Sequence, residues 1–597
     1  MARKLGHIGG DELGRLIKPH LAAGRYDIAA ELCSEAVAAT PKSAELWRLS
    51  GIVALYGEKL DDAIKFFEET VKLAPESAAA HSALAAALLR AGPSSRQQAR
   101  HELEAALAID PRRQDDADTL VSMMLKEGEV AAARELLSRS LALGLQCPRA
   151  CAFMASAELD EGKIDEASKL FILGAKWSPK VFTAIEACYL SLMRKMAFET
   201  ARLVLAPLAS AFPERAELKI NLAVCQMQTD RFDECFESLK DAAALEPDSP
   251  PLLVNQGVAL YKIGRFDESA EALRKALSIV PDDPQASLAL SLSLLKAGKL
   301  KEGWLFWESR LKQPDMANIS RCKLPLWTPS NSKSARILVR CEQGFGDSIL
   351  FARFIPLLRR QCSHVAFICR RELLSLFAGF EGIDELIALG GPEEDAHGCD
   401  SRIPLASLPQ HFIDSPDAIP KLEKPVFAVA PERVEFWRSF VAGNLPGGAK
   451  LKAGICFSGS QVNIPGRKRS IPAEELEPLF KIPGVAWFSL QADAEEGKLD
   501  TSAVRTSGLI KNFSDSAALI QELDIVVSID TAVAHLSGSL LKPTLIALCA
   551  ESDWRWFAGR NDSPWHPTAR LFRQSSRNSW LDVIEAMREE VARQRKK

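Results

Sequence analysis

Residues 525–548 read IVVSIDTAVAHLSGSLLKPTLIAL. An apolar, β-branched run stops at Asp530 and Thr531, a helical run follows, and a lysine-proline pair separates it from a second apolar run. This order predicts a strand, a loop, a helix and a second strand. In an open parallel sheet, ligands bind where loops leave the carboxyl ends of strands, and a helix N-terminus there favours an anion. The stretch therefore predicts an α/β fold in which Asp530, Thr531 and His535 meet an anionic ligand.

The same three residues also have an ordinary structural explanation. Asp530 and Thr531 could do no more than cap the helix. His535, one turn into the helix, could be a packed histidine. The rest of the C-terminal half decides between these interpretations.

Composition narrows the class of protein. The chain has 597 residues, with 74 Lys and Arg against 78 Asp and Glu, so it predicts several domains and no nucleic-acid partner. No apolar run approaches the roughly twenty residues of a membrane span, and residues 1–7 lead into no apolar signal core. The 13 cysteines include no Cys-x-x-Cys pair, which favours buried thiols over disulfides or a metal site. We expect a cytoplasmic protein.

The first half of the chain contains a sequence repeat. Seven prolines are separated by 34, 36, 68, 34, 34 and 34 residues, and one missing proline near position 145 restores the period. A small residue precedes each proline by twelve positions, where two helices must approach closely. The prolines are Pro41, Pro75, Pro111, Pro179, Pro213, Pro247 and Pro281, and the small residues are Ala29, Ala63, Ala99, Ala167, Ala201, Cys235 and Ser269. Each period predicts one two-helix unit.

The second unit carries Trp47, Gly51, Ala63, Phe67 and Pro75. It resembles the tetratricopeptide repeat, and glycines at the expected turn positions agree: Gly24, Gly128, Gly162, Gly264 and Gly298. The resemblance implies an α-solenoid of about nine units over residues 9–315, with a degenerate fourth unit. Stacked units form a concave groove that usually binds a peptide, so we expect a protein partner.

Two features of the repeats bear on function. Asn221 and Asn255 occupy equivalent positions and could belong to an asparagine ladder that holds a peptide, or be ordinary polar residues on a solvated helix. Trp304 and Trp307 are predicted to form an apolar seam against the next domain. Residues 316–334 are predicted to be a linker because Ser, Pro and Asn gather near its end.

Residues 335–445 are predicted to form a first nucleotide-fold lobe. A buried strand at 337–340 leads into a glycine-rich turn, Glu342 to Asp347, and an amphipathic helix at 348–360. Gly344 and Gly346 meet neither the dinucleotide fingerprint nor the P-loop. The turn could still bring backbone close to a substrate.

Residues 446–597 are predicted to form the second lobe, with a terminal helix. A strand at 453–457 is followed by a polar loop that ends in Arg467, Lys468 and Arg469. Three cations beside a strand end suit a phosphate or pyrophosphate, although ordinary surface charge is the competing interpretation.

Four motifs of this half resemble those of bacterial tetratricopeptide-repeat glycosyltransferases, whose catalytic half is similar to heptosyltransferases. They are residues 342–347, 469–472, 489–491 and 530–536. The resemblance implies a GT-B architecture, two Rossmann-like lobes around a cleft. Enzymes of this kind generally use a nucleotide-sugar and neither a metal nor another cofactor. The members that act on flagellin in polar-flagellated alphaproteobacteria have this length and domain order.

The resemblance also implies residue roles. Asp347 matches the proposed general base, with helix capping as an equally weighted explanation, and Glu342 is the alternative base. Arg469, with Lys468 in reserve, and the amides beside Thr531 would stabilise the leaving nucleotide. His535 would shape the donor site together with Asp530, and the backbone at Gly344 and Gly346 would approach it. The chain departs from the family's pattern at Phe457 to Ser460, where we expect different contacts, and at Cys549 to Glu551, which leaves the identity of the donor open.

The sequence therefore predicts a metal-independent protein O-glycosyltransferase. The acceptor would be Ser or Thr of a protein held by the repeats, with flagellin as the implied acceptor and a nonulosonic acid such as pseudaminic acid as a candidate sugar. The alternatives are a non-catalytic repeat scaffold and a transferase of lipopolysaccharide sugars.

Overall fold

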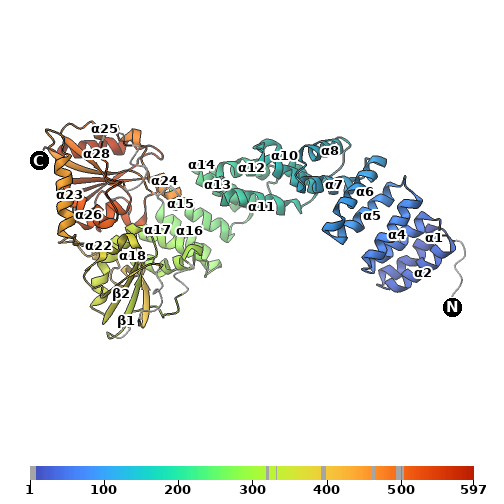
Figure 1. The fold of residues 1–597 in the computed structure, drawn as a ribbon, viewed down its shortest axis with the longest axis horizontal. Coiled ribbons are helices and arrows are strands. Elements are labelled where there is room, and N and C mark those ends of the chain that lie inside the picture. The colour runs from blue at the N-terminus through green and yellow to red at the C-terminus, as the bar shows by residue number, and fades with distance from the viewer. Residues whose placement is uncertain are drawn as a thin grey trace. The chain divides into compact units, whose positions relative to one another are not determined.

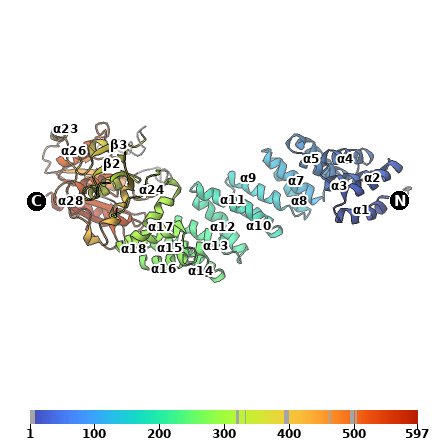
Figure 2. The ribbon, with the colours of Figure 1, turned by 90° about the horizontal axis from the view of Figure 1, so that it is seen from below.

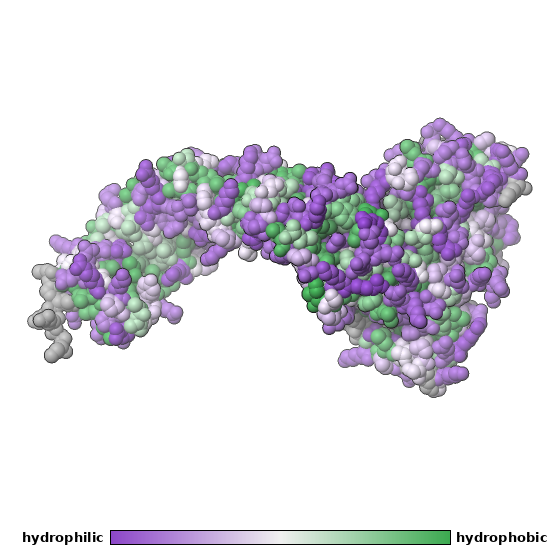
Figure 3. Space-filling view, turned by 180° about the vertical axis from the view of Figure 1, so that it is seen from behind, coloured by the Kyte–Doolittle hydropathy of each residue, from purple (hydrophilic) through white to green (hydrophobic). Residues whose placement is uncertain are grey.

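The computed structural model describes residues 8–316, 322–330, 333–390, 398–459, 464–491, 499 and 503–596. The chain forms two compact units, Met1–Glu246 and Pro247–Lys597. Within the described residues, no helix is both long and apolar enough to cross a membrane. Figure 3 shows hydrophilic side chains over much of the visible surface, with smaller hydrophobic areas between them.

The first unit is built from helices alone over its described residues. Successive antiparallel helices stack side by side (Figures 1 and 2). They are α1 (Gly10–Ala22), α2 (Tyr26–Ala39), α3 (Ala44–Tyr56), α4 (Leu60–Leu73), α5 (Ala78–Ala91), α6 (Arg96–Ile109), α7 (Gln114–Lys126), α8 (Val130–Ala142), α9 (Pro148–Asp160), α10 (Ile164–Trp177), α11 (Val181–Arg194), α12 (Phe198–Ala211), α13 (Ala216–Gln228) and α14 (Phe232–Leu245). A short 3-10 turn, η1 (Pro93–Ser95), precedes α6.

The small residue predicted in each unit is buried in the helix packing. Ala29, Ala63, Ala99, Ala167 and Ala201 are completely buried. The degenerate fourth unit keeps this register, because Ala133 is also completely buried. Its missing proline is replaced by a turn in which Gly144 has a φ of 78°. The proline was therefore the dispensable part of the pattern, and the close helix contact was the required part.

The turn inside each unit requires a left-handed backbone. In most units a glycine adopts this left-handed conformation, as Gly264 does with a φ of 85°. Glu58, Met196 and Asp230 occupy the same turn position in other units with φ of 58°, 59° and 60°. A side chain in this conformation costs roughly 1–2 kcal/mol because Cβ crowds the following carbonyl.

We therefore expect Met196→Gly to raise the free energy of unfolding of the surrounding repeats by up to about 1 kcal/mol. Met193→Gly is the matched control, because Met193 lies inside α11 and the same change there should cost about 1 kcal/mol. Native-state hydrogen exchange of α11 and α12 measures both. Slower exchange in the first variant and faster exchange in the second is the expected pair of results, and two losses would contradict the account.

The second unit begins with two further helix pairs and continues into two α/β lobes. The pairs are α15 (Pro250–Lys262), α16 (Phe266–Ile279), α17 (Pro284–Lys296) and α18 (Leu300–Trp307), followed by η2 (Glu308–Lys312) and η3 (Pro314–Met316). Trp304 and Trp307 form the predicted seam: their indole N–H groups donate to Ile413 O at 2.9 Å and Ala406 O at 2.7 Å. Within the predicted linker, Trp327 N donates to Arg402 O at 2.8 Å. Residues 317–321 and 331–332 of that linker lie outside the described residues.

The first lobe contains a parallel sheet in the order β3-β2-β1-β4. Its elements are β1 (Arg336–Arg340), α20 (Phe345–Phe351), η4 (Ala352–Phe354), α21 (Ile355–Arg359), β2 (His364–Cys369), α22 (Arg371–Phe377), β3 (Glu385–Ala388), β4 (Ser401–Pro404), η5 (Leu405–Ser407), η6 (Pro409–His411) and η7 (Pro416–Ala418). Helix α23 (Pro431–Gly443) follows and packs against α26 (Phe513–Glu522) of the second lobe. The single helix predicted at 348–360 is wrong in two ways. It begins three residues earlier, and it is interrupted before Pro356, which lacks the N–H that a continuous helix needs.

The second lobe contains a parallel sheet in the order β6-β5-β7-β8-β9. Its elements are β5 (Leu451–Cys456), α24 (Ile464–Arg469), η8 (Ala473–Leu476), α25 (Glu477–Phe480), β6 (Val485–Ser489), α26 (Phe513–Glu522), β7 (Ile525–Ile529), α27 (Ala532–Ser539), β8 (Thr544–Leu548), η10 (Trp554–Trp556), β9 (Ala569–Arg573) and α28 (Leu581–Gln594). The opening stretch thus folds as predicted, with every residue of β7 and β8 buried. The predicted α-solenoid and two-lobed α/β fold are confirmed.

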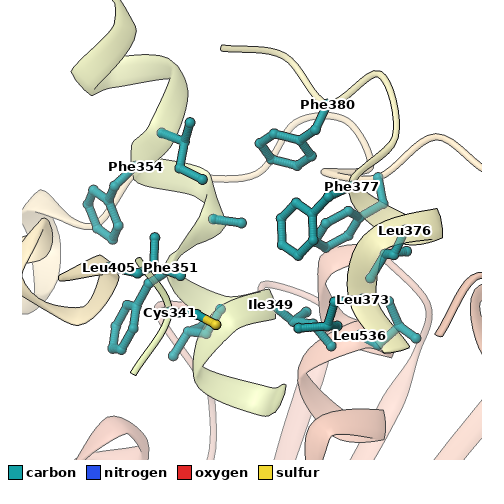
Figure 4. Close-up of a cluster of buried hydrophobic side chains, with 14 of the residues drawn as sticks. Cys341, Ile349, Phe351, Phe354, Leu373, Leu376, Phe377, Phe380, Leu405 and Leu536 are labelled. Carbon is teal, nitrogen blue, oxygen red and sulfur yellow. The ribbon is translucent and has the colours of Figure 1, made fainter. Parts of the chain in front are cut away.

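The two lobes share a hydrophobic core. Leu536 of α27, in the second lobe, belongs to the same buried cluster as Ile349, Phe351 and Leu373 of the first lobe. Figure 4 shows Ile349 and Leu536 close together beside Leu373. Helices α20 and α27 therefore pack against each other, and this contact sets the position of the loops that precede them.

Candidate functional site

A cavity of about 740 Å³ lies between the two lobes. It is lined by the N-terminal ends of α20, α26 and α27 and by loops that follow β2, β5 and β8. The charged residues lining it are Asp347, Arg370, Glu372, Arg469, Lys511, Asp530, Asp553 and Arg555. The cavity thus brings together loops at the carboxyl ends of strands in both sheets, where ligands bind in folds of this kind.

Asp347 enters the cavity from the start of α20. The sequence predicted Asp347 as the capping residue of this helix. In the structure Asp347 is the third residue of the helix. Its Oδ2 accepts a hydrogen bond from Gly344 N at 3.0 Å, and its Oδ1 lies 2.5 Å from Arg555 Nη2. Burial raises the pKa of Asp347, and the charge of Arg555 opposes that rise. Asp347 therefore caps its helix end and faces the cleft at the same time.

Arg555 lines the cavity from the loop that follows β8. Its Nη2 donates to Gln343 Oε1 at 2.8 Å, and its Nη1 donates to Asp553 Oδ1 at 2.7 Å. Although burial lowers the pKa of Arg555, the carboxylates of Asp347 and Asp553 raise it further. The guanidinium stays charged and joins the loops of the two lobes. Trp554 and Trp556, on either side of Arg555, are buried in the core.

The start of α27 presents free backbone donors to the cavity. Thr531 occupies the N-cap position, but its side chain makes no capping hydrogen bond. Its hydroxyl lies 3.1 Å from Ser528 Oγ instead. Asp530, beside it, is buried, and burial together with the Asp553 carboxylate raises its pKa. The simple capping interpretation therefore does not account for Thr531, and the helix dipole is available to an anion.

His535 is part of a buried stack of rings. It lies 4.9 Å from the Trp556 ring, nearly parallel to it, and its Nδ1 is 3.1 Å from His566 Nε2. Burial, reinforced by the charge of Arg555, lowers the pKa of His535 to about 3. Burial also lowers the pKa of His566 well below its usual value. Both imidazoles are neutral near pH 7, and one donates a hydrogen bond to the other.

This burial predicts how stability depends on pH. Because the folded-state pKa values lie below the ordinary value of 6.5, the unfolded chain binds protons first as the pH falls. The stability that depends on these neutral imidazoles is therefore fully present above pH 6.5 and is lost as the pH falls toward about 3. We expect His535→Gln to have a flatter pH dependence of the thermal midpoint than wild type. His101→Gln, at an exposed histidine of α6, should keep the wild-type slope, and equal slopes in all three proteins would contradict the account.

Of the predicted cations, Arg469 lines the cavity and Lys468 does not. Arg469 ends α24, and its buried Nε has no hydrogen-bond partner among the described residues. Lys468 Nζ lies 3.6 Å from Glu551 Oε1, outside the cavity. Residues 460–463, part of the same predicted polar loop, lie outside the described residues.

Glu342, the alternative base, is not among the cavity-lining residues. Its side chain is 1% exposed and its Oε1 accepts a hydrogen bond from Arg310 Nη2 at 2.8 Å. The same oxygen accepts from Ala406 N at 3.1 Å. Burial raises the pKa of Glu342, and Arg310 opposes the rise. The structure thus separates Glu342 from Asp347, although the two lie in one motif.

Both predicted glycines line the cavity, for different reasons. A Cβ on Gly346 would lie 2.9 Å from His535 Cδ2, so only glycine allows α20 to approach α27 this closely. Gly344 contributes its N–H to Asp347. The 489–491 motif has a supporting role, because Gln491 Oε1 accepts from Ser458 N at 3.2 Å and its Nε2 donates to Ser458 O at 3.0 Å.

The asparagines suggested for a peptide ladder bond to their own helices, and Asn221 Nδ2 also donates to Tyr189 Oη of α11 at 3.2 Å. Asn221 Nδ2 donates to Glu217 O at 2.9 Å, and Asn255 Nδ2 donates to Pro251 O at 2.8 Å.

Among the described residues, no group of three or more His, Cys, Asp or Glu could hold a metal ion.

Comparison with known proteins identifies the helical half. The family model described as tetratricopeptide repeat matches residues 16–78 and 254–303. The helical half is a tetratricopeptide-repeat array. The matched segments include helices at both ends of the series, so the repeats predicted from the proline period are confirmed in type.

Known proteins are similar to parts of this chain. Protein FlbA of Caulobacter vibrioides is 25% identical over 305 residues, which are 47% of this chain and 50% of FlbA. The chain therefore spans about half the length of this curated relative. This chain is also similar to a glycosyl transferase family 9 structure from Veillonella parvula, at 14% identity and a TM-score of 0.32, with 41% of this chain and 88% of that chain covered.

A second solved structure is similar to this chain. It is the C-terminal part of a repeat-containing protein from Cytophaga hutchinsonii, at 14% identity and a TM-score of 0.31, with 40% of this chain and 98% of that chain covered. The chain combines tetratricopeptide repeats with an α/β half of two parallel sheets.

Proposed function

We propose that this protein is a glycosyltransferase that transfers a sugar from a nucleotide-sugar to a Ser or Thr hydroxyl of a protein held by the repeats. One observation carries the proposal. Asp347, Arg469 and the uncapped N-terminus of α27 line a single cavity between two parallel sheets. This arrangement offers a base for a hydroxyl and positive charge for a departing phosphate.

The proposed reaction assigns a task to each group. The acceptor oxygen attacks the anomeric carbon, the bond from that carbon to the phosphate oxygen breaks, and Asp347 takes the hydroxyl proton. The raised pKa of Asp347 favours this transfer because it brings the carboxylate closer in basicity to the working pH. Arg469 and the α27 amides stabilise the charge that leaves with the nucleotide. The backbone at Gly344 and Gly346, with Asp530 and neutral His535, shapes the donor site.

The family resemblance supplies the acceptor and the sugar of the proposal. It points to flagellin as the protein and to a nonulosonic acid such as pseudaminic acid, carried as its CMP form. Repeats of this family suit a peptide partner better than a lipid-linked sugar, which favours a protein acceptor over lipopolysaccharide.

The experiment compares flagellin from cells that lack the protein with flagellin from cells that carry it as wild type, Arg469→Ala or Arg467→Ala. Arg467 is the matched control because it lies on α24 too but is exposed and does not line the cavity. Intact mass should show sugar with wild type and Arg467→Ala, and little or none with the other two. Unmodified flagellin in every strain would reject flagellin as the acceptor, and full modification with Arg469→Ala would reject the assigned phosphate site.

A further inference from the structure

The last helices of the repeat array are bonded to the loop that carries Arg555. Lys296, the final residue of α17, is 4% exposed, and its ammonium donates three hydrogen bonds. The acceptors are Ser552 O, Ser552 Oγ and Asp553 O, each at 2.8 Å. In addition, Ala558 N donates to Lys296 O at 2.9 Å. Lys296 therefore forms hydrogen bonds with both ends of the segment 552–558.

Arg310, at the end of the repeat array, forms hydrogen bonds with the loop 342–347 of the first lobe. Arg310, in η2, is 3% exposed and donates to Glu342 Oε1 at 2.8 Å and to Ser407 Oγ at 2.6 Å. Glu342 is the first residue of the glycine-rich turn that ends at Asp347. The turn is therefore held at its start by the repeat helices and at its end by α20.

The two fastened loops meet in the cavity. Arg555 Nη2 contacts Gln343 Oε1 at 2.8 Å and Asp347 Oδ1 at 2.5 Å. Trp554, in the same loop as Arg555, packs against both Trp304 and Trp307 with ring centroids 5.6 Å apart. The contact between Asp347 and Arg555 thus depends on two loops that are both attached to α17, α18 or η2. The loop of Arg555 is also held within its own lobe, because Arg573 of β9 donates to Trp556 O at 2.7 Å and to Phe557 O at 2.8 Å.

We propose that Lys296 and Arg310 are positioning residues, through which the end of the repeat array sets the loops 342–347 and 551–557 so that Asp347 and Arg555 meet. Glu342 then serves as the anchor of its loop. Both residues act through hydrogen bonds to largely buried acceptors, and an apolar replacement removes those hydrogen bonds. What the ordered loops do for catalysis rests on the proposed function, whereas their order is a property of the fold.

The test is hydrogen exchange of the full chain in four variants: Lys296→Met, Lys296→Arg, Arg310→Met and Lys299→Met. Methionine keeps the length of lysine without its donors, and arginine keeps the charge and donors. Lys299 is the control because it is exposed and pairs with Asp267. We expect Lys296→Met to speed exchange in 551–557, and Arg310→Met in 342–347, by at least about tenfold. Lys296→Arg should retain most of the protection, and Lys299→Met all of it.

Three results would overturn the proposal. They are unchanged exchange in both loops, an equal increase across β7 and β8 that marks general destabilisation, or Lys296→Arg as disruptive as Lys296→Met. Sugar transfer is measured on the same preparations. Faster loop exchange with undiminished transfer would also overturn it, whereas a wild-type protein that transfers no sugar refutes the proposed function alone, because the exchange data still report on the loops.

Discussion

Asp347→Asn is expected to lower the rate of sugar transfer by about 10²–10⁴-fold, the range for loss of a general base. The asparagine keeps the size of the side chain and an oxygen that can accept from Gly344 N, so the start of α20 should persist. What it loses is the ability to take the acceptor proton. The rate is measured as the appearance of glycosylated flagellin by intact mass.

The control for this variant is Glu381→Gln, which removes a carboxylate at an exposed position of the same lobe. It should transfer sugar at the wild-type rate. Donor binding should change little in Asp347→Asn, because the phosphate contacts are assigned to Arg469 and α27. If Asp347→Asn keeps wild-type transfer, Asp347 is only a helix cap, the alternative that the sequence left open.

Arg555→Met should destabilise the second unit by about 3 kcal/mol, the lower end of the cost of breaking a buried ion pair. The lower end applies because the side chains of Asp347 and Asp553 remain 22% and 37% exposed. The variant leaves two carboxylates facing one another without the cation between them. Chemical denaturation of the full chain, followed by a probe in the α/β half, measures the loss.

This loss should shrink at acid pH. Without Arg555, the folded-state pKa of Asp347 rises further above its unfolded value, so the folded variant binds a proton more tightly than the unfolded chain. The penalty is present at pH values above that raised pKa and declines as the carboxyl becomes protonated. Arg560→Met, at an arginine paired with Asp562 on the surface, should cost less than about 1 kcal/mol at any pH. A comparable loss in both variants would contradict the bridging role of Arg555.

The repeat fold could be predicted because every unit needs the same close helix packing and the same turn, so the residues that meet these needs recur along the sequence. A small side chain at every helix crossing and a left-handed turn within each unit leave a period that does not depend on any single residue. The fourth unit illustrates the limit of the proline signal: Ala133 keeps the crossing after the proline is lost. Helix interruption before Pro356 was also readable in principle, since proline has no N–H for the preceding turn.

The sequence predicted the motifs that line the site, but not the hydrogen bonds and ion pairs that link its loops. Asp347, Arg469 and Thr531 follow strand ends, so topology alone brings them to one cavity. Arg555 follows no such rule, and its position depends on Gln343 and Lys296, each more than two hundred residues away along the chain. Likewise, Glu342 resembles a catalytic carboxylate in sequence, and only its contact with Arg310 reveals an anchoring environment. Pairings between distant polar residues leave no periodic signal in one sequence.

The most direct test of the central claim is a reconstituted reaction. Purified full-length protein is incubated with the nucleotide-sugar pool of its own cells and with flagellin from cells that lack the protein, and the intact mass of flagellin is followed with time. The account predicts a stepwise mass increase of one sugar unit or more with wild type and none within the same time with Asp347→Asn. Equal increases with both proteins, or no increase with wild type although flagellin from wild-type cells carries the sugar, would contradict it.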